Sequence, residues 1–309
     1  MKGLLVWMGG KWCLAEEIIP RFPTKYAKYI EVFGGGGSIL FARKKTDKVE
    51  VYNDFNKHLV NLFQVVKERP FEFLHELGVY NLNSRQEFMC LYKFLNNERI
   101  PYTYLAENIR LAKEMLPPLE EKEFVDLLTR KAEDRDLMQA VNYFKLISYS
   151  FAAGGRSYNS QPSKIVNISH HIYKCSERLR KVNIENKDFE GLIKQHDSEE
   201  SFFYCDPPYY KAEYYEACFS EQDHHRLKNV LANMKGKFLL SYNDCPFIRE
   251  LYKDFCIVSV ERNNFISNKS GSIYKEVLIA NYDIREKNQD AYEQLALESC
   301  LLESEETNE

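Results

Sequence analysis

Apolar and polar residues follow two patterns along the chain, and these predict strands and helices in alternation. Short apolar runs at 28–33 (KYIEVF) and 49–54 (VEVYND) have the length and the β-branched or aromatic content of buried strands. The first leads into a glycine turn and a helix (GGGGSILFARK), and the second into a helical pattern (NKHLVNLFQVVKERP) that Pro70 ends. This order of elements predicts the start of a doubly wound parallel sheet.

The middle of the chain has helical spacing, and sheet signals return after it. From about Pro70 to Tyr149, apolar residues recur three or four positions apart, and an exposed loop follows at 152–164 (AAGGRSYNSQPSK). The later strand-like segments are KVNIENKDF, SFFYCDPPYY, GKFLLSYND, DFCIVSVERN and KEVLIANY, with the amphipathic helix SEQDHHRLKNVLANM between two of them. We therefore expect one sheet domain, residues 1–68 and 165–285, interrupted by a helical insertion at 69–164 that is longer than an ordinary connection.

Charge is distributed unevenly along the 309 residues. The net charge of −4 is the balance of −7 in the acidic C-terminal tail, 286–309, and +3 in the rest of the chain. A mildly basic body is compatible with binding nucleic acid but does not require it, because most charged residues lie on solvated faces. We expect the tail to form a short helix with a frayed end, and we assign it no function.

The cysteine and histidine spacings contain no metal-binding pattern. The eight cysteines include no CxxC pair, and the seven histidines lack the spacing of metal ligands, so no metal is expected. The first residues contain no signal-peptide h-region, and no apolar run approaches the roughly 18 residues that a membrane-spanning helix needs. Together these features predict a cytoplasmic protein that is not associated with a membrane.

Four glycines, Gly34 to Gly37, stand where the first strand is followed by a helix. Backbone without a Cβ atom can approach a ligand closely there. Asp54 ends the next strand about 20 residues on, the usual position of an acid that binds ribose hydroxyls. Together they predict a site for an adenosine-type ligand. A dinucleotide is the obvious alternative, although Ile39 or Leu40 occupies the position of the third glycine in the GxGxxG pattern.

The segment FFYCDPPYY, at 202–210, ends an apolar strand with an aspartate, two prolines and two tyrosines. Two successive prolines fix φ and remove two donors, so the chain leaves the strand in a stiff conformation. Asp206 and the Pro207 carbonyl then offer two acceptors to one amino group, and Tyr209 offers a ring on which a base can stack. Acceptors that draw the hydrogens of a nucleobase amine out of the ring plane localise its lone pair toward an electrophile. Cys205 alternates to the opposite face of the strand, where we expect it in the core.

The same segments resemble motifs of the Dam-like DNA adenine-N6 methyltransferases, the D12 class of the alpha group. The similarity covers nearly the whole chain, and the glycine motif, the insertion and the DPPY motif stand in the alpha-group order. The matching segments are GGKWCLAEEIIPRFP, YIEVFGGGGSILF, VYNDFNKHLVNLF, FFYCDPPYY, YYEACFSEQDHHRL, FLLSYND and YKEVLIAN. Val32 stands where the usual glycine motif has a proline, which affects the stiffness of the strand end. The resemblance implies a Rossmann-like α/β fold with a seven-stranded, mostly parallel sheet, and S-adenosylmethionine as cofactor.

The resemblance also implies roles for individual residues. The target adenine would be held by a base pocket of Asp206, Pro207, Pro208 and Tyr209. The cofactor would contact Trp7, Lys11, Phe33, Gly34, Gly35, Gly36, Asp54, Asp188, Phe189 and Asp206. Within that set the glycines would line the methionine part, Asp54 would bind the ribose, and Asp188 and Phe189 would flank the cofactor adenine.

Double-stranded DNA is the implied partner, and the insertion with its final loop is the predicted recognition region. The loop residues Arg156, Asn159, Gln161 and Lys164 have side chains that can donate to or accept from base edges and phosphates. Because the reactive amine lies inside the base stack, the target adenine must be flipped out, at a cost of a few kcal/mol. No covalent enzyme intermediate is expected, and no target sequence follows from these residues.

The leading hypothesis is a site-specific DNA adenine-N6 methyltransferase. Two alternatives stay open: methylation of another amine of the same kind, at cytosine N4 or at adenine in RNA, and a catalytically silent DNA-binding regulator that keeps the fold. Asp206 favours adenine over cytosine, and the intact pocket argues against a silent regulator. The sequence leaves open whether a partner restriction endonuclease exists, and whether the role is restriction protection, replication and repair marking, or phage defence.

Overall fold

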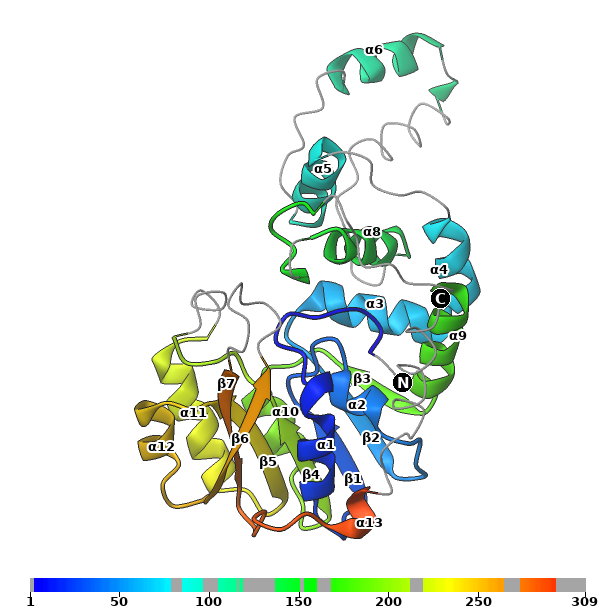
Figure 1. Cartoon of the computed structure of the whole chain (residues 1–309). Coiled ribbons are helices and arrows are strands. Elements are labelled where there is room, and N and C mark those ends of the chain that lie inside the picture. The colour runs from blue at the N-terminus through cyan, green and yellow to red at the C-terminus, as the bar shows by residue number, and fades with distance from the viewer. Residues whose placement is uncertain are drawn as a thin grey trace, which may run out of the picture.

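The structure is a computed structural model, which describes residues 3–78, 85–96, 105–115, 117–118, 137–150, 153–159, 168–211, 219–263 and 273–292. Figure 1 shows how its elements are arranged. The strands are β1 (Lys28–Glu31), β2 (Val49–Asn53), β3 (Val182–Glu185), β4 (Ser201–Cys205), β5 (Lys237–Asn243), β6 (Cys256–Asn263) and β7 (Ile273–Ala280). The helices are η1 (Trp12–Leu14), α1 (Ala15–Ile18), η2 (Ile19–Arg21), α2 (Ser38–Ala42), α3 (Lys57–Glu68), α4 (Pro70–Leu77), α5 (Arg85–Leu95), α6 (Leu105–Met115), α8 (Leu137–Ser148), α9 (Ile168–Leu179), α10 (Phe189–His196), α11 (Glu221–Ala232), α12 (Pro246–Leu251) and α13 (Gln289–Tyr292).

The strands form one seven-stranded sheet in the order β3-β2-β1-β4-β5-β7-β6. Neighbours among β1 to β5 pair in parallel, and β7 is antiparallel to both β5 and β6. In the centre of the sheet, Ile30 of β1 lies opposite Val51 of β2 and Phe203 of β4. The direction of the strand order reverses between β1 and β4, and such a switch point forms the crevice in which open α/β sheets bind ligands. The predicted seven-stranded, mostly parallel sheet is confirmed.

Two apolar layers cover the sheet, because alternate residues of each strand point to opposite faces. Tyr29 and Tyr204 belong to the layer formed with α1, α2, α3 and α9. Ile30, Phe203 and Cys205 belong to the layer formed with α10, α11 and α12. All five side chains are buried, as expected for parallel strands that are covered on both faces. The core position predicted for Cys205 is therefore confirmed.

The helices after β2 continue the first of these layers away from the sheet. α3 packs against α8, α4 and α9, and Phe73 of α4 meets Phe144 of α8 edge to face, with ring centroids 5.6 Å apart. Phe88 of α5 is buried in the same apolar cluster as Tyr52 of β2. Figure 1 shows α5 and α6 extending from this stack away from the sheet. The division into a catalytic domain and an insertion stays a prediction, and the apolar core is continuous across its boundaries.

A buried ion cluster ties the helix after the glycine turn to the helix that follows the insertion. Glu50 of β2 accepts a hydrogen bond from Arg43, next to α2, at 3.1 Å. It also accepts from Arg178 of α9 through both of its oxygens, at 2.6 and 2.9 Å. All three side chains are buried, and loss of Glu50 would leave two guanidinium groups in the core without their carboxylate. The cluster therefore fixes how α2 and α9 lie on β2, beside the glycine turn.

The start of the acidic tail is docked on the N-terminal part of the chain. Arg21 donates from Nε to the carbonyl of Ile284 at 3.1 Å, and the backbone N–H of Asn288 donates to the carbonyl of Pro20 at 2.6 Å. α13 packs on η2. The expected short helix is therefore present, whereas the frayed end expected after it lies outside the described residues.

Candidate active site

The carboxyl ends of β1, β2 and β4 lie along one edge of the sheet, and residues singled out from the sequence gather there. The backbone N–H of Val32 donates to the carbonyl of Tyr204 at 3.0 Å, which continues the β1–β4 pairing to the ends of the strands. The register pairs Glu31 with Tyr204, so the glycine turn after β1 and Asp206 after β4 follow adjoining strand ends at the switch point of the sheet. The glycine motif and the DPPY motif are therefore neighbours in the fold, although about 170 positions separate them in sequence.

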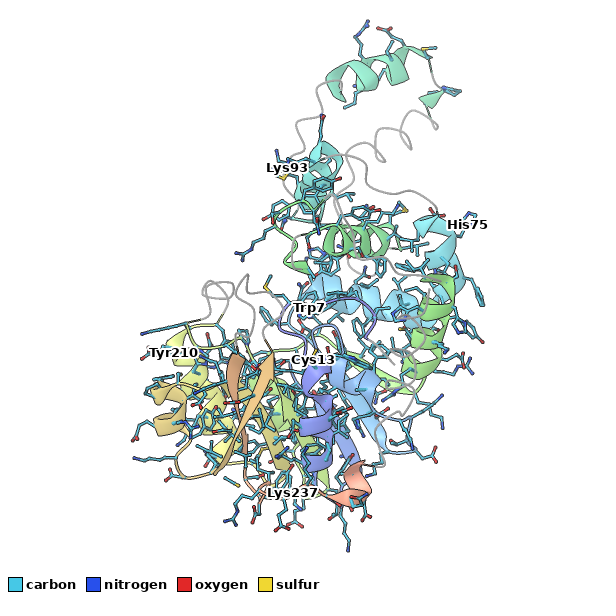
Figure 2. All side chains as sticks on the ribbon, viewed as in Figure 1. Trp7, Cys13, His75, Lys93, Tyr210 and Lys237 are labelled. Carbon is cyan, nitrogen blue, oxygen red and sulfur yellow. The ribbon has the colours of Figure 1, made fainter. Side chains whose placement is uncertain are left out.

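The glycine turn is shaped by side chains that pack where glycine has no Cβ. A Cβ atom added at Gly34 would lie 2.1 Å from the Tyr52 ring. One added at Gly35 or Gly36 would lie 2.8 or 2.7 Å from Trp7, which Figure 2 labels at this edge of the sheet. Gly35 also has a φ of 51°, in the left-handed region, and its carbonyl accepts from the Tyr52 hydroxyl at 2.7 Å. The sequence predicted these glycines for ligand approach, and the structure adds that the packing of the turn requires them.

Asp54 supports the same turn. Its Oδ2 accepts the backbone N–H of Gly35 at 2.9 Å, and its Oδ1 accepts that of Asn56 at 2.8 Å. Burial raises the pKa of the Asp54 carboxyl, and the backbone donors oppose that increase. The backbone N–H of Phe55 also bonds this carboxylate, and one of its roughly four lone-pair sites stays available for a ribose hydroxyl. Phe55, the next residue, is 79% exposed, which is unusual for a large aromatic side chain. The sequence pattern did not predict a role for it.

Asp188 and Phe189 lie beside the end of β1, because the Phe189 ring packs near Phe33 with centroids 5.6 Å apart. Oδ1 of Asp188 accepts the backbone N–H of Glu190 at 3.0 Å, which caps α10, and a bond from Arg226 at 2.9 Å. The Arg226 guanidinium also lies over the Phe189 ring, 4.7 Å from its centroid. Oδ2 of Asp188 accepts no hydrogen bond from the described part of the chain, which leaves that oxygen for a ligand amine.

Asp206 has one carboxylate oxygen held and the other open. Oδ1 accepts from the Lys11 ammonium and from the Ser241 hydroxyl, each at 2.9 Å. The described residues donate no hydrogen bond to Oδ2, and the side chain is 18% exposed. Burial raises the pKa of the Asp206 carboxyl; the Glu276 carboxylate adds to the increase, whereas Lys11 and Ser241 oppose it. Neighbours thus orient this acceptor toward a donor that the chain does not itself supply.

Tyr209 lies next to this acceptor and is fixed at both ends. The Pro-Pro pair precedes it, and its hydroxyl donates to Oε2 of Glu276 at 2.6 Å. Nζ of Lys11 lies over the Tyr209 ring, 4.6 Å from its centroid, so one ammonium contacts both Asp206 and Tyr209. Pro207 is buried, and its carbonyl accepts no hydrogen bond from the residues that the structure describes. Lys11, Asp206 and Tyr209 are therefore together in the fold, while their chemical roles stay predictions.

The sequence pattern did not reveal two polar residues of this site. Ser241, near the end of β5, and Glu276, in β7, are both buried, and the positions on either side of them in the strands are largely apolar. A hydroxyl or charged side chain at an inward position of a strand requires a buried partner, and that was the available signal. Their partners, Asp206 and Tyr209, are distant in sequence, so only the fold identifies them.

The predicted DNA-binding loop is only partly described. Arg156 is exposed, and the backbone N–H of Asn159 donates to the carbonyl of Tyr149, just after α8, at 2.7 Å. Gln161 and Lys164 lie outside the described residues. Contact of these four residues with DNA stays a prediction.

The chemistry of this edge rests on carboxylates, one lysine and aromatic rings. Among the described residues, no three histidine, cysteine, aspartate or glutamate side chains are grouped as metal ligands. None of the described helices is long and apolar enough to cross a membrane. The structure places the glycine turn after β1 and the Asp-Pro-Pro-Tyr segment after β4 of a doubly wound sheet, the arrangement that the sequence resemblance implies for a methyltransferase of amino groups.

Comparison with known proteins identifies the family within that class. The family model for D12 class N6 adenine-specific DNA methyltransferases matches residues 7–266, and the chain belongs to this family. The chain is 30% identical to the Type II methyltransferase M1.LlaDCHI of Lactococcus lactis subsp. cremoris, over 89% of this chain and 94% of that protein. It is 26% identical to the Type II methyltransferase M.MjaIII of Methanocaldococcus jannaschii, over 91% and 99% of the two chains. The resemblance inferred from the motifs is confirmed, and the function is N6 methylation of adenine in DNA.

Proposed function

We propose that the chain transfers a methyl group from S-adenosylmethionine to the N6 amine of an adenine that is flipped out of double-stranded DNA. The observation that carries this proposal is the open Oδ2 of Asp206, next to the end of β1 and the Tyr209 ring. A carboxylate held in this way suits an amine, which has to be oriented before it attacks an electrophile.

The groups near the glycine turn fit S-adenosylmethionine. Asp54 suits the ribose hydroxyls, and Oδ2 of Asp188 suits the amino group of the cofactor adenine. The exposed Phe55 ring offers a face for that adenine. We propose that Phe33 and the glycines Gly34 to Gly36 line the methionine part. When bound, the cofactor supplies an electrophilic methyl group on a sulfonium.

Asp206 and the Pro207 carbonyl then orient the target amine. Each accepts one of the two amine hydrogens, which draws the nitrogen lone pair away from the purine ring and toward the methyl donor. Lys11 and Ser241 keep Asp206 oriented through Oδ1, and Lys11 also favours the ionised carboxylate. The amine gains a positive charge as it takes the methyl group, and its surplus proton passes to Oδ2 of Asp206 and from there to solvent.

Access to the amine requires the adenine to leave the base stack. Stacking on Tyr209 contributes roughly 1 to 3 kcal/mol, which offsets part of the flipping cost. We assign recognition of the surrounding DNA to the insertion at 69–164, including Arg156. Because the relatives are named Type II methyltransferases, we also propose that the chain works beside a restriction endonuclease in the cytoplasm.

Expression of the full chain in a bacterium that lacks adenine methyltransferases tests this function. Long-read sequencing of the host DNA should detect N6-methyladenine at one recurring sequence, and Asp206→Asn should strongly reduce the fraction of sites that are methylated. The matched control Asp283→Asn, at an exposed side chain that pairs with Arg285, should leave the signal intact. N4-methylcytosine instead, or methylation found only in RNA, would support the alternative substrates. DNA binding with no methylation of either nucleic acid would indicate a silent regulator.

A further inference from the structure

Glu276 lies at the active-site edge of the sheet, on a strand that runs in the opposite direction to the parallel strands β1 to β5. It lies in β7, which is antiparallel to its neighbours, and it is opposite Asn243, the last residue of β5. Leu278, two positions on, belongs to the same apolar layer as Tyr204. Because side chains alternate along a strand, Glu276 and Asp206 point to the same face of the sheet.

Glu276 is a buried acid with a strong hydrogen bond. Only 1% of its surface is exposed, and its Oε2 accepts the Tyr209 hydroxyl at 2.6 Å. A carboxylate is rarely buried without such bonds, because removing its charge from water is costly. A bond to an ionised acceptor is also about twice as strong as a neutral one and orients its donor more firmly. The Tyr209 ring is therefore held at its hydroxyl end as well as by the two prolines before it.

The two acids beside this ring favour a cation, and the ammonium of Lys11 already lies over it. The acids Asp206 and Glu276 lie near the ring, and Lys11 Nζ lies over it, 4.6 Å from its centroid. Burial raises the pKa of Tyr209 well above its usual value, as do the two neighbouring carboxylates, so its hydroxyl stays a donor at neutral pH. The face of an aromatic ring is negative, and a hydrogen bond from its hydroxyl to a carboxylate makes it more so.

We propose that Glu276 is a positioning residue for methyl transfer, which acts through Tyr209. It holds the ring in the orientation in which a flipped adenine stacks, and it makes the ring more attractive to the amine as that amine becomes cationic. This assignment rests on the proposed function, because it concerns the same base pocket.

Single-turnover methylation by the full-length protein measures this role. The substrate is plasmid DNA from a methylation-deficient host, with S-adenosylmethionine at saturation. Glu276→Gln keeps an acceptor but removes the charge, and Tyr209→Phe keeps the ring but removes the donor. Each should lower the single-turnover rate about 10- to 100-fold. Since Glu276→Gln weakens and Tyr209→Phe removes the same bond, the double variant should be no slower than the slower single one.

The dissociation constants and the unfolding midpoint distinguish positioning from damage to the fold. The variants should bind S-adenosylmethionine and DNA within about threefold of the wild-type affinity, so that the loss falls on the rate. The same double-mutant cycle, measured on denaturant midpoints, should show that positions 276 and 209 are energetically coupled.

The neighbouring tyrosine supplies a matched control. Tyr210 donates to Oε2 of Glu221 at 3.1 Å, but this pair is exposed at the surface. Water can replace that bond, so Glu221→Gln and Tyr210→Phe should change the rate less than about twofold. The contrast between the two tyrosine–carboxylate pairs isolates the effect of the buried one.

Several outcomes would overturn the inference. One is that Glu276→Gln and Tyr209→Phe fold and methylate within about twofold of the wild-type rate. Another is that the double variant loses rate by the product of the two single-variant factors, which would show that the two positions act independently. If Glu276→Gln does not fold, Tyr209→Phe alone decides, and a wild-type rate in that variant overturns the inference. Failure of the proposed function gives a different result from failure of this inference: the wild-type protein transfers no methyl group, or Asp206→Asn keeps the wild-type rate.

Discussion

Asp54 and Asp206 both follow parallel strands at the same edge of the sheet, yet their oxygens are engaged differently. Both oxygens of Asp54 accept backbone N–H groups, from Gly35 and Asn56, so this carboxylate shapes the glycine turn. Asp206 has only Oδ1 engaged, by Lys11 and a serine hydroxyl, and the described residues leave Oδ2 open. A strand-ending acid indicates a ligand site in both cases. The partners of each oxygen are the basis on which we propose that Asp54 binds the cofactor and that Asp206 takes part in the reaction.

The neighbours also set the charge of each acid. Burial raises the pKa of both carboxyls. Backbone N–H groups oppose the increase at Asp54, whereas a full positive charge, that of Lys11, opposes it at Asp206. The ionised form of Asp206 is therefore favoured by the charge of Lys11, which a single substitution removes, and by the hydrogen bond from Ser241.

The largest effect is expected from Asp206→Asn. An amide of the same size cannot accept a proton from the methylated amine and is a weaker acceptor, so the single-turnover rate should fall about 100- to 1,000-fold. Affinity for S-adenosylmethionine should fall much less than the rate, because Asp206 is one of ten cofactor contacts that the resemblance implies and lies outside the glycine turn. Quench-flow with labelled cofactor and titration calorimetry measure the two quantities. If the affinity for S-adenosylmethionine fell by as large a factor as the rate, Asp206 and Asp54 could not be assigned different roles.

Asp54→Asn should show the reverse pattern. Loss of a charged acceptor for the ribose should weaken binding of S-adenosylmethionine about 10- to 100-fold. At saturating cofactor the single-turnover rate should stay close to that of the wild type. Calorimetry over a cofactor series checks the affinity. A rate at saturation as low as that of Asp206→Asn would show that the two acids are not functionally distinct.

Lys11→Met should shift the pH dependence of the reaction. In the proposed mechanism the ionised form of Asp206 is the active one, so the single-turnover rate should rise as pH rises through the pKa of that carboxyl. Lys11 lowers this pKa, and its removal therefore moves the acid limb of the profile to higher pH. Rates measured across the pH range for both proteins give the two midpoints. An acid limb of the pH–rate profile that stays in place or moves to lower pH would contradict the proposal that the positive charge of Lys11 lowers the pKa of Asp206.

The smallest effect concerns a third acid at this edge, Glu31, at the end of β1. It is 2% exposed, and burial raises its pKa from 4.5 to about 8, although Tyr29 donates to it at 2.8 Å. Between these pH values the folded state binds a proton that the unfolded state has lost, so Glu31 makes stability fall as pH rises from 4.5 to about 8. From pH 6 to pH 8 this amounts to about 2 kcal/mol. Denaturant unfolding of Glu31→Gln at both pH values should show a correspondingly smaller decrease.

The parts of the fold that local patterns encode could be predicted from the sequence. Apolar runs and turn residues identify β1 and β2 and the strand ends that carry the glycine turn and Asp206, because those signals lie within a few neighbouring residues. For the glycines, the sequence predicted close approach of a ligand but not that the packing of the turn requires residues without a Cβ atom. That Trp7 and Tyr52 pack where the Cβ atoms would be depends on contacts between segments, which a local pattern does not contain.

The rest of the site depends on which strand ends adjoin. β7 inserts antiparallel between β5 and β6, and this insertion carries Glu276 to the Tyr209 hydroxyl. The parallel pairing of β4 with β5 brings Ser241 of β5 beside Asp206, which follows β4. No spacing within either segment specifies these partners. The buried polar residues at inward strand positions were visible in the sequence, but the bonds that satisfy them were not.

The most direct test of the central claim is the mass of the nucleosides from DNA treated with the purified chain and S-adenosylmethionine that carries a fully deuterated methyl group. The wild-type protein should give N6-methyldeoxyadenosine that carries the whole label, and Asp206→Asn should give none within the same turnover. Label on cytosine, or equal label on adenine with the two proteins, would contradict the account.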